Sequence, residues 1–160
     1  MIVIGAPEER LALAKKWGAN RVINIDELTD PARRKDLIFE MTGGRGPEIV
    51  IEASGVPAAF NEGLEIIQKG GRYLVLGQTS ADTVPVAPGM ITGKGITVIG
   101  SVSAAIPHFY KALQFIKNRQ KKYPFADIVT TRYPLEEIND ALANMASGKE
   151  IKPAIDNRDR

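Results

Sequence analysis

The sequence predicts an α/β protein, a doubly wound parallel sheet with helices on both faces that forms three layers. Short β-branched runs alternate with helical patterns along the chain. This alternation is typical of a parallel sheet, because each strand needs a crossover helix before the next one. The 160 residues are 44% hydrophobic and 25% charged, an ordinary composition for one globular domain. No repeat or long linker divides them, so we expect a single domain over residues 1–160.

The first part of the chain is expected to hold strands that alternate with two helices. Pro7 is suited to open the first helix, and Gly18 is suited to end it. Thr29 or Asp30 is suited to cap the second helix, which begins at Pro31. The expected strands are Ile2–Ile4, Val22–Ile25 and the very apolar Glu48–Ala53.

The second part continues the alternation. The third helix follows Pro57 and ends at Gly70-Gly71, and a long amphipathic helix begins at Pro107. Residues 78–95 contain repeated glycine and proline, so they are expected to be irregular. The other expected elements are strands over Tyr73–Leu76 and Ile96–Ile99, an extended piece at Ile128-Val129, a helix over Leu135–Met145 and a short edge strand over Ile151–Ile155.

The composition excludes several classes of site and partner. The chain has no cysteine, which excludes disulfides, thiolate nucleophiles and cysteine-based zinc sites. Its one histidine, His108, cannot form a histidine pair for a metal, and we expect it on the surface of a helix. A net charge of +2 gives no reason to expect nucleic acid or a membrane as a partner. There is no signal-like start and no run of apolar residues long enough to span a bilayer, so we expect a cytoplasmic protein.

Several segments, taken in order, carry a resemblance to a known family. They are Arg10–Ala19, Glu52–Gly55, Gly70–Gly77, Ile91–Ser101, Tyr133–Leu142 and Ile151–Pro153. Together they resemble the cofactor-binding (Rossmann) domain of zinc-dependent alcohol dehydrogenases, the medium-chain dehydrogenase family. The resemblance extends over essentially the whole chain. It implies a parent oxidoreductase that uses NAD or NADP.

The family pattern contains parts with no counterpart in these residues. The resemblance implies an upstream zinc-bearing catalytic domain, then a first Rossmann strand, a glycine-rich turn and a first helix. No G-x-G-x-x-G motif follows a strand here. Gly43-Gly44-Arg45-Gly46 ends a helix instead of opening one, and the segment Gly89–Gly95 lacks the hydroxyl residue of a P-loop. We therefore expect a truncated Rossmann domain.

The loss of the first strand has a consequence for the sheet. The Rossmann order 3-2-1-4-5-6 loses a central strand, and an open gap would leave unpaired strand edges in water. We expect the gap to close, which gives the flavodoxin-like order 2-1-3-4-5 in this chain's own numbering. The alternative is a homodimer, formed through the exposed sheet edge or the C-terminal segment.

The resemblance also implies which residues would contact a dinucleotide. They lie in the loops after three strands: Ser54, Gly55 and Val56; Leu76, Gly77 and Gln78; Gly100, Ser101 and Val102. Gly5 stands where the family has an acid that reads the ribose, a change compatible with a 2′-phosphate that Arg10 would contact. On the alternative interpretation, Gly5 makes a tight turn and Arg10 is a solvated helix residue.

These residues imply little chemistry for the isolated chain. The helix after the first strand begins Pro7-Glu8-Glu9, and a proline followed by two carboxylates does not favour phosphate. We expect no tightly bound cofactor, no zinc and no catalytic residue, with NAD or NADP bound weakly at most. The preferred hypothesis is a non-catalytic cofactor domain. The alternatives are a weak nucleotide-binding module, and an oxidoreductase part that is active only with a separately supplied catalytic domain.

Overall fold

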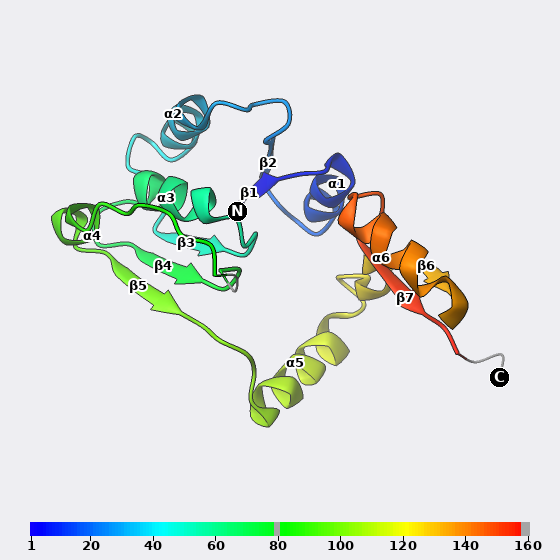
Figure 1. Ribbon diagram of the computed structural model, residues 1–160. Coiled ribbons are helices and arrows are strands. Elements are labelled where there is room, and N and C mark those ends of the chain that lie inside the picture. Colours follow the sequence, from blue (N-terminus) through cyan, green and yellow to red (C-terminus); the bar gives the residue numbers. More distant parts are fainter. Residues whose placement is uncertain (79–80, 158–160) are drawn as a thin grey trace. The chain divides into compact units, whose positions relative to one another are not determined.

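The computed structural model describes residues 1–78 and 81–157 of the chain (Figure 1). The chain divides into two compact units. We call Met1–Asn24 with Ala104–Arg160 the terminal unit, and Ile25–Ser103 the central unit. The single domain expected over residues 1–160 stays a prediction.

The terminal unit is built on two pairs of parallel strands, β1 with β2 and β6 with β7. Its elements are β1 (Ile2–Gly5), α1 (Glu8–Lys16), β2 (Arg21–Asn24), α5 (Ile106–Arg119), η1 (Phe125–Ile128), β6 (Val129–Tyr133), η2 (Leu135–Glu137), α6 (Ile138–Ala146) and β7 (Lys152–Ile155). The edge strand expected near the C-terminus is therefore confirmed. The last helix begins as a 3-10 turn at Leu135 and becomes an α-helix at Ile138.

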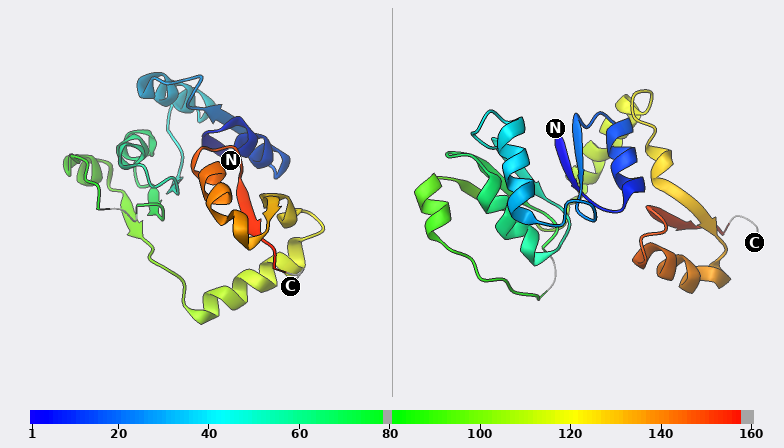
Figure 2. Two further views of the ribbon diagram at one scale, coloured as in Figure 1. Left: turned by 45° about the vertical axis from the view of Figure 1, so that its right-hand side comes forward. Right: turned by 90° about the horizontal axis from the view of Figure 1, so that it is seen from above.

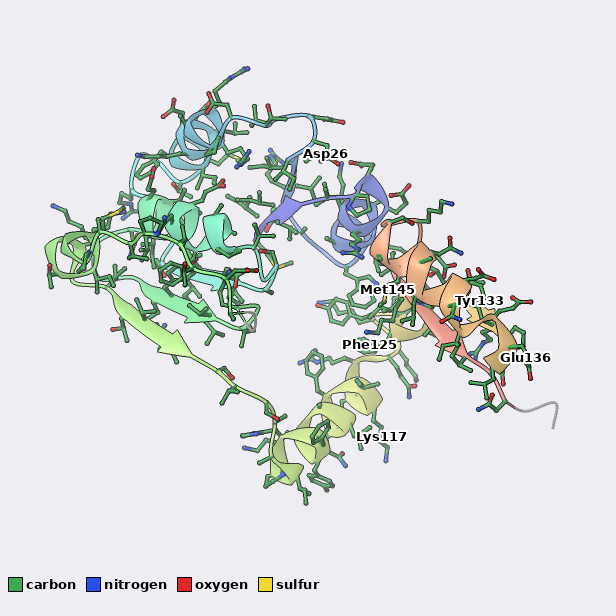
Figure 3. The ribbon with its side chains drawn as sticks, viewed as in Figure 1. Asp26, Lys117, Phe125, Tyr133, Glu136 and Met145 are labelled. Atoms are coloured by element: carbon green, nitrogen blue, oxygen red, sulfur yellow. The ribbon has the colours of Figure 1, made fainter. Side chains whose placement is uncertain are left out.

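Two side-chain clusters hold the terminal unit together locally. Trp17 at the end of α1 lies 5.5 Å from Phe125, centroid to centroid, with the rings edge to face. In the second cluster, the buried Glu150 carboxylate accepts hydrogen bonds from Thr130 and Tyr133 of β6. Figure 3 labels Phe125 of the first cluster and Tyr133 of the second. Helix α5 forms over the expected segment, but no residue of α5 is buried. The amphipathic pattern of α5 therefore predicts the helix correctly, but it does not predict that the apolar side of the helix is exposed.

The central unit contains one sheet of three parallel strands in the order β3-β4-β5. Its elements are α2 (Pro31–Met41), β3 (Ile49–Glu52), α3 (Pro57–Ile66), β4 (Arg72–Val75), α4 (Gly89–Lys94) and β5 (Thr97–Gly100). Asp30 caps α2 as expected, because its side chain accepts a hydrogen bond from the Ala32 amide at 2.9 Å. Helix α3 packs against β3 and β4 (Figure 2).

The core of the central unit lies between α3 and the sheet. Four buried side chains form it: Leu64, Ile67, Tyr73 and Ile96. Met90 and Ile91 of α4 pack against this cluster. Helix α4 corrects the expectation that residues 78–95 are wholly irregular, although residues 79–80 lie outside the described part. Two glycines in six residues give a poor intrinsic helix, so packing on the core decides its structure.

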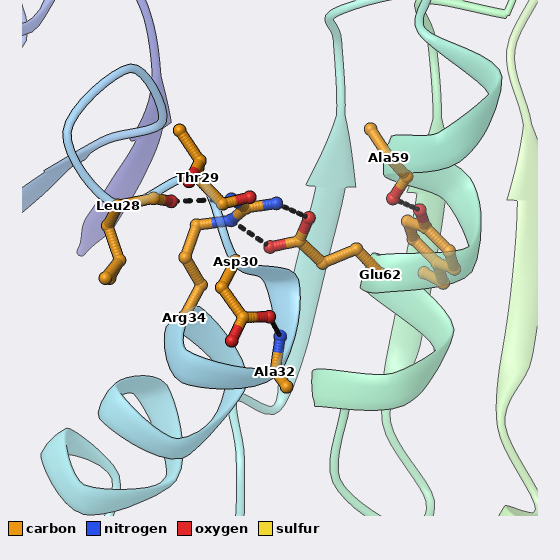
Figure 4. Close-up of polar contacts among 8 residues, drawn as sticks. Leu28, Thr29, Asp30, Ala32, Arg34, Ala59 and Glu62 are labelled. Carbon is orange, nitrogen blue, oxygen red and sulfur yellow. Dashed lines mark hydrogen bonds and ion pairs between the residues drawn. The ribbon is translucent and has the colours of Figure 1, made fainter.

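A buried ion pair joins the two longer helices of the central unit (Figure 4). Arg34 of α2 binds both carboxylate oxygens of Glu62 in α3, at 2.8 and 2.6 Å. The Arg34 guanidinium also donates to the carbonyl oxygens of Leu28 and Thr29. A two-pronged contact of this kind fixes how α2 lies on α3, because both groups must keep one geometry.

The α/β class with parallel strands is confirmed, and the strand order 2-1-3-4-5 is not. Within the described residues, β1 is hydrogen-bonded to β2 in one sheet, and β3 to β4 in another. The pairings β2-β1 and β3-β4-β5 are those of the expected order. The order as a whole stays a prediction, because the step from Ile2–Gly5 to Ile49–Glu52 is a non-local pairing that no local sequence pattern specifies.

In residues 1–78 and 81–157, no helix is both long and apolar enough to cross a bilayer.

Candidate functional site

The parallel sheet of the central unit brings three of the expected loops to one edge. Glu52 of β3 lies in register with Val75 of β4, and Val75 with Gly100 of β5. All three strands therefore end at the same side of the sheet. Ligands of α/β sheets bind at this carboxyl edge. The loops after β3 and β4 also touch each other, as the following contacts show.

The Glu52 carboxylate organises the loop between β3 and α3. Its Oε1 atom accepts hydrogen bonds from the Ser54 amide at 2.7 Å, the Ser54 hydroxyl at 2.7 Å and the Gly55 amide at 2.9 Å. The side chain is only 4% exposed. Burial alone raises the pKa of Glu52, but the hydrogen bonds from Ser54 and Gly55 outweigh it and hold the pKa below its ordinary value. The group is therefore a carboxylate at neutral pH.

Two glycines let the loops after β3 and β4 approach backbone to backbone. A Cβ at Gly77 would overlap the Gly55 nitrogen and would lie 2.7 Å from the Ala53 carbonyl carbon. At Gly55, where φ is +76°, a Cβ would lie 2.8 Å from the Gly77 oxygen. The Gln78 side chain adds a hydrogen bond to the Val56 carbonyl at 2.9 Å. The two loops thus form one interlocked unit.

The interlocked loops carry apolar side chains that face solvent. Val56 is 54% exposed, and Leu76 is 42% exposed. We call these two residues the apolar lip. The hydrogen bonds of Glu52 and the backbone contacts between the two loops hold these side chains in place. The apolar lip is therefore an exposed apolar surface on well-supported loops. Such a surface suits the face of a flat, partly apolar ring better than it suits a phosphate.

The other two expected contact residues belong to the terminal unit. Gly5 is the last residue of β1, and its φ is not in the left-handed region. A Cβ there would meet nothing within 4 Å, so the tight-turn interpretation of Gly5 is wrong. Arg10 is an exposed residue of α1, in agreement with the solvated-residue interpretation.

The expected surface position of His108 is confirmed. His108 lies exposed in the first turn of α5, where its Nδ1 atom accepts a hydrogen bond from the Ala105 amide at 3.2 Å.

One residue of the site, Glu52, is not among the expected contacts, because its position predicts a strand residue. One signal points to Glu52: an acid directly after the apolar run Ile49-Val50-Ile51 lies where a central strand is normally apolar. Gln78 belongs to an expected loop, but nothing local in the sequence predicts its hydrogen bond to Val56, which lies 22 residues away.

The residues present do not fit a zinc ion. The chain has no cysteine and a single histidine. Among the described side chains, no group of three or more histidine, aspartate or glutamate residues is placed to hold a metal. Zinc sites in proteins need three or four such ligands, so these described residues do not form a zinc site by themselves.

Solved and curated proteins resemble the chain over nearly its whole length. It is 35% identical to 5-exo-hydroxycamphor dehydrogenase of Pseudomonas putida over 157 residues, which are 98% of the chain and 43% of that relative. The alcohol dehydrogenase of Thermotoga maritima has 32% identity and a TM-score of 0.85, covering 96% of the chain and 42% of that protein. Benzyl alcohol dehydrogenase of Acinetobacter calcoaceticus has 30% identity and a TM-score of 0.79, covering 96% and 41%.

The chain therefore spans about two fifths of the length of these relatives. The family described as zinc-binding dehydrogenase matches residues 1–118. This match includes every expected contact residue, from Gly5 to Ser101, and confirms the resemblance found in the sequence. The chain belongs to the zinc-binding dehydrogenase family.

Proposed function

We propose that this chain is the part of a dehydrogenase's cofactor domain that contacts the nicotinamide end of NAD or NADP, and that these residues alone catalyse no turnover. The observation that carries the proposal is the interlocked pair of loops at the carboxyl edge of β3-β4-β5. Rigid loops at this edge are where α/β sheets hold nucleotides. The proposed contact residues are those of the apolar lip, with Ser54, Gly55, Gly77, Gly100 and Ser101.

The chemistry of the lip suits one part of a dinucleotide. Val56 and Leu76 offer exposed apolar contact to a planar ring, and the interlocked backbone beneath keeps them in place. Bound nicotinamide would supply the hydride acceptor or donor of a dehydrogenase. The contribution of this chain is to bind and orient that ring, and to exclude water from one of its faces.

The same residues explain why we expect weak binding. The pyrophosphate of a dinucleotide is usually held by amides at a glycine-rich helix start, and these 160 residues contain no such motif after a strand. Helix α1 follows the first strand instead, with Pro7 before it and two acids, Glu8 and Glu9, in its first turn. Negative charge at this end repels phosphate.

Turnover needs a further group. Hydride transfer to or from an alcohol carbon requires polarisation of the oxygen, which a metal or an acid supplies. Glu52, the acid that holds the loops of the apolar lip, is buried and ionised, so it is not placed to supply this polarisation. If a catalytic part supplied separately completed the site, this chain would then act within an oxidoreductase.

The test is an amide NMR titration of the chain with NAD and with NADP. We expect shifts confined to Ser54–Val56, Leu76–Gln78 and Gly100–Ser101, with the same loops affected by both cofactors. A spectrum unchanged at millimolar cofactor would overturn the binding proposal. A rise in reduced-nicotinamide absorbance on adding an alcohol, with or without zinc, would overturn the absence of turnover. Light scattering on the same sample tests the homodimer that is the alternative to a closed sheet, and a mass of 17.4 kDa would exclude it.

A further inference from the structure

We propose that Glu52 is a positioning residue for the cofactor, because its side chain and its main chain together hold both loops that carry the apolar lip. This inference rests on the proposed function, since it concerns the same loops. Glu52 itself lies beneath the lip and is not expected to contact the ring. It would act through Ser54, Gly55 and Gly77.

The side chain of Glu52 reaches the lip through a short series of hydrogen bonds. The Ser54 hydroxyl donates to Glu52 Oε1 at 2.7 Å and accepts from the Val56 amide at 3.2 Å. Val56 is therefore tied to the carboxylate through one intervening side chain. The additional bonds from the Ser54 and Gly55 amides fix the turn in which Gly55 takes its positive φ.

The main chain of Glu52 holds the other loop. Its carbonyl oxygen accepts hydrogen bonds from the Leu76 amide at 2.9 Å and from the Gly77 amide at 3.1 Å. Glu52 thus holds Val56 indirectly, through the Ser54 hydroxyl, and Leu76 directly, through its own carbonyl oxygen. Removing the carboxylate would disturb the hydrogen bonds that hold Val56. It would also disturb the loop that carries Leu76, because Gly55 and Gly77 of the two loops lie in close contact.

The cost of this arrangement argues against a purely local structural role. A carboxylate that is 4% exposed loses most of its hydration, and its Oε2 atom is buried without a hydrogen-bond partner within the described residues. A buried charge that several hydrogen bonds keep ionised, at the carboxyl edge of a parallel sheet, is characteristic of functional sites.

The experiment compares three variants of the full chain. Glu52→Ala removes the acceptor, and Glu52→Gln keeps the shape and one acceptor oxygen but removes the charge. Glu48→Gln makes the same chemical change at an exposed glutamate just before β3, so it serves as the matched control. The first measurement, amide hydrogen exchange without ligand, needs no cofactor. The amides of Leu64 and Tyr73 report whether the core of the central unit remains folded.

We expect Glu52→Ala to speed exchange at Ser54, Gly55 and Val56 by about tenfold or more, because several hydrogen bonds are lost together. Glu52→Gln should fall between Glu52→Ala and the wild type, and Glu48→Gln should match the wild type. Loop exchange that is unchanged in Glu52→Ala, with core amides still protected, would overturn the proposal whatever the cofactor does.

The second measurement is the affinity for NADH. Glu52→Ala should weaken binding by about tenfold, and Glu52→Gln should restore part of it. If the wild type binds NADH and Glu52→Ala binds it equally tightly, the positioning role is overturned but the proposed function is not. A wild-type chain that binds no NADH would overturn the proposed function and the positioning role with it.

Discussion

The central and terminal units use the same kind of local sequence but differ in how much of it they bury. In the central unit, α3 and α4 enclose Leu64, Ile67, Tyr73 and Ile96 against a parallel sheet. In the terminal unit, α5 is clearly amphipathic, yet Leu113 is 64% exposed and no α5 residue is buried. Periodicity alone therefore indicates a helix, and only tertiary contacts show whether its apolar side is used.

Two leucine-to-alanine variants, one in each unit, give the strongest test of this difference in burial. Leu64→Ala should lower the free energy of unfolding by about 4 kcal/mol, because it leaves a cavity in a closed core. Leu113→Ala removes the same atoms from an exposed helix side, so it should cost less than about 1 kcal/mol. Urea unfolding followed by circular dichroism measures both. Equal losses in the two variants would mean that α5 is covered in solution.

The next contrast lies within the central unit, where two ion pairs join α2 to α3. Arg34→Ala should cost about 3 kcal/mol, because it leaves the Glu62 carboxylate nearly buried without its partner. Lys35→Ala breaks the Lys35–Glu65 pair, whose side chains are 41% and 48% exposed, and should cost less than about 1 kcal/mol. The same unfolding measurement applies. A small loss in Arg34→Ala would show that α2 and α3 separate readily.

Two glycine-to-alanine variants compare the tolerance for a side chain at the candidate site with that at the end of β1. Gly77→Ala should destabilise the chain by about 2 kcal/mol, since its Cβ would overlap backbone atoms of the loop after β3. Gly5→Ala introduces the same methyl group where nothing lies within 4 Å, so its stability should be nearly that of the wild type. Thermal unfolding of the two variants measures the difference. If Gly5→Ala were the more harmful, the central loops would not be the rigid ones.

The smallest expected effect is a change in pH dependence. The pKa of Glu52 is lower in the folded chain than in the unfolded one, so its stabilisation is present above the unfolded pKa and is lost as pH falls through the folded pKa. Glu52→Gln should therefore show a shallower loss of stability in acid than the wild type. Glu48→Gln should keep the wild-type slope. Urea unfolding between about pH 6 and about pH 3 tests this, and parallel slopes for wild type and Glu52→Gln would contradict it.

Much of the candidate site could be predicted from the sequence. The loops after Glu48–Ala53, Tyr73–Leu76 and Ile96–Ile99 were expected from strand ends and from a resemblance that the family match bears out. The role of Glu52 and the partner of Gln78 could not be assigned in this way. Both depend on which backbone atoms the folded loops bring near these side chains: Ser54 for Glu52, and Val56 for Gln78.

Local signals in the sequence predict the class of the protein and the order of its elements. β-branched runs, prolines at helix starts and glycines at helix ends act over a few residues, so a local reading detects them. The formation of α4 from a poor helix sequence and the interlock of Gly55 with Gly77 arise instead from tertiary contacts. These features depend on contacts between residues far apart in the chain, which no local pattern encodes.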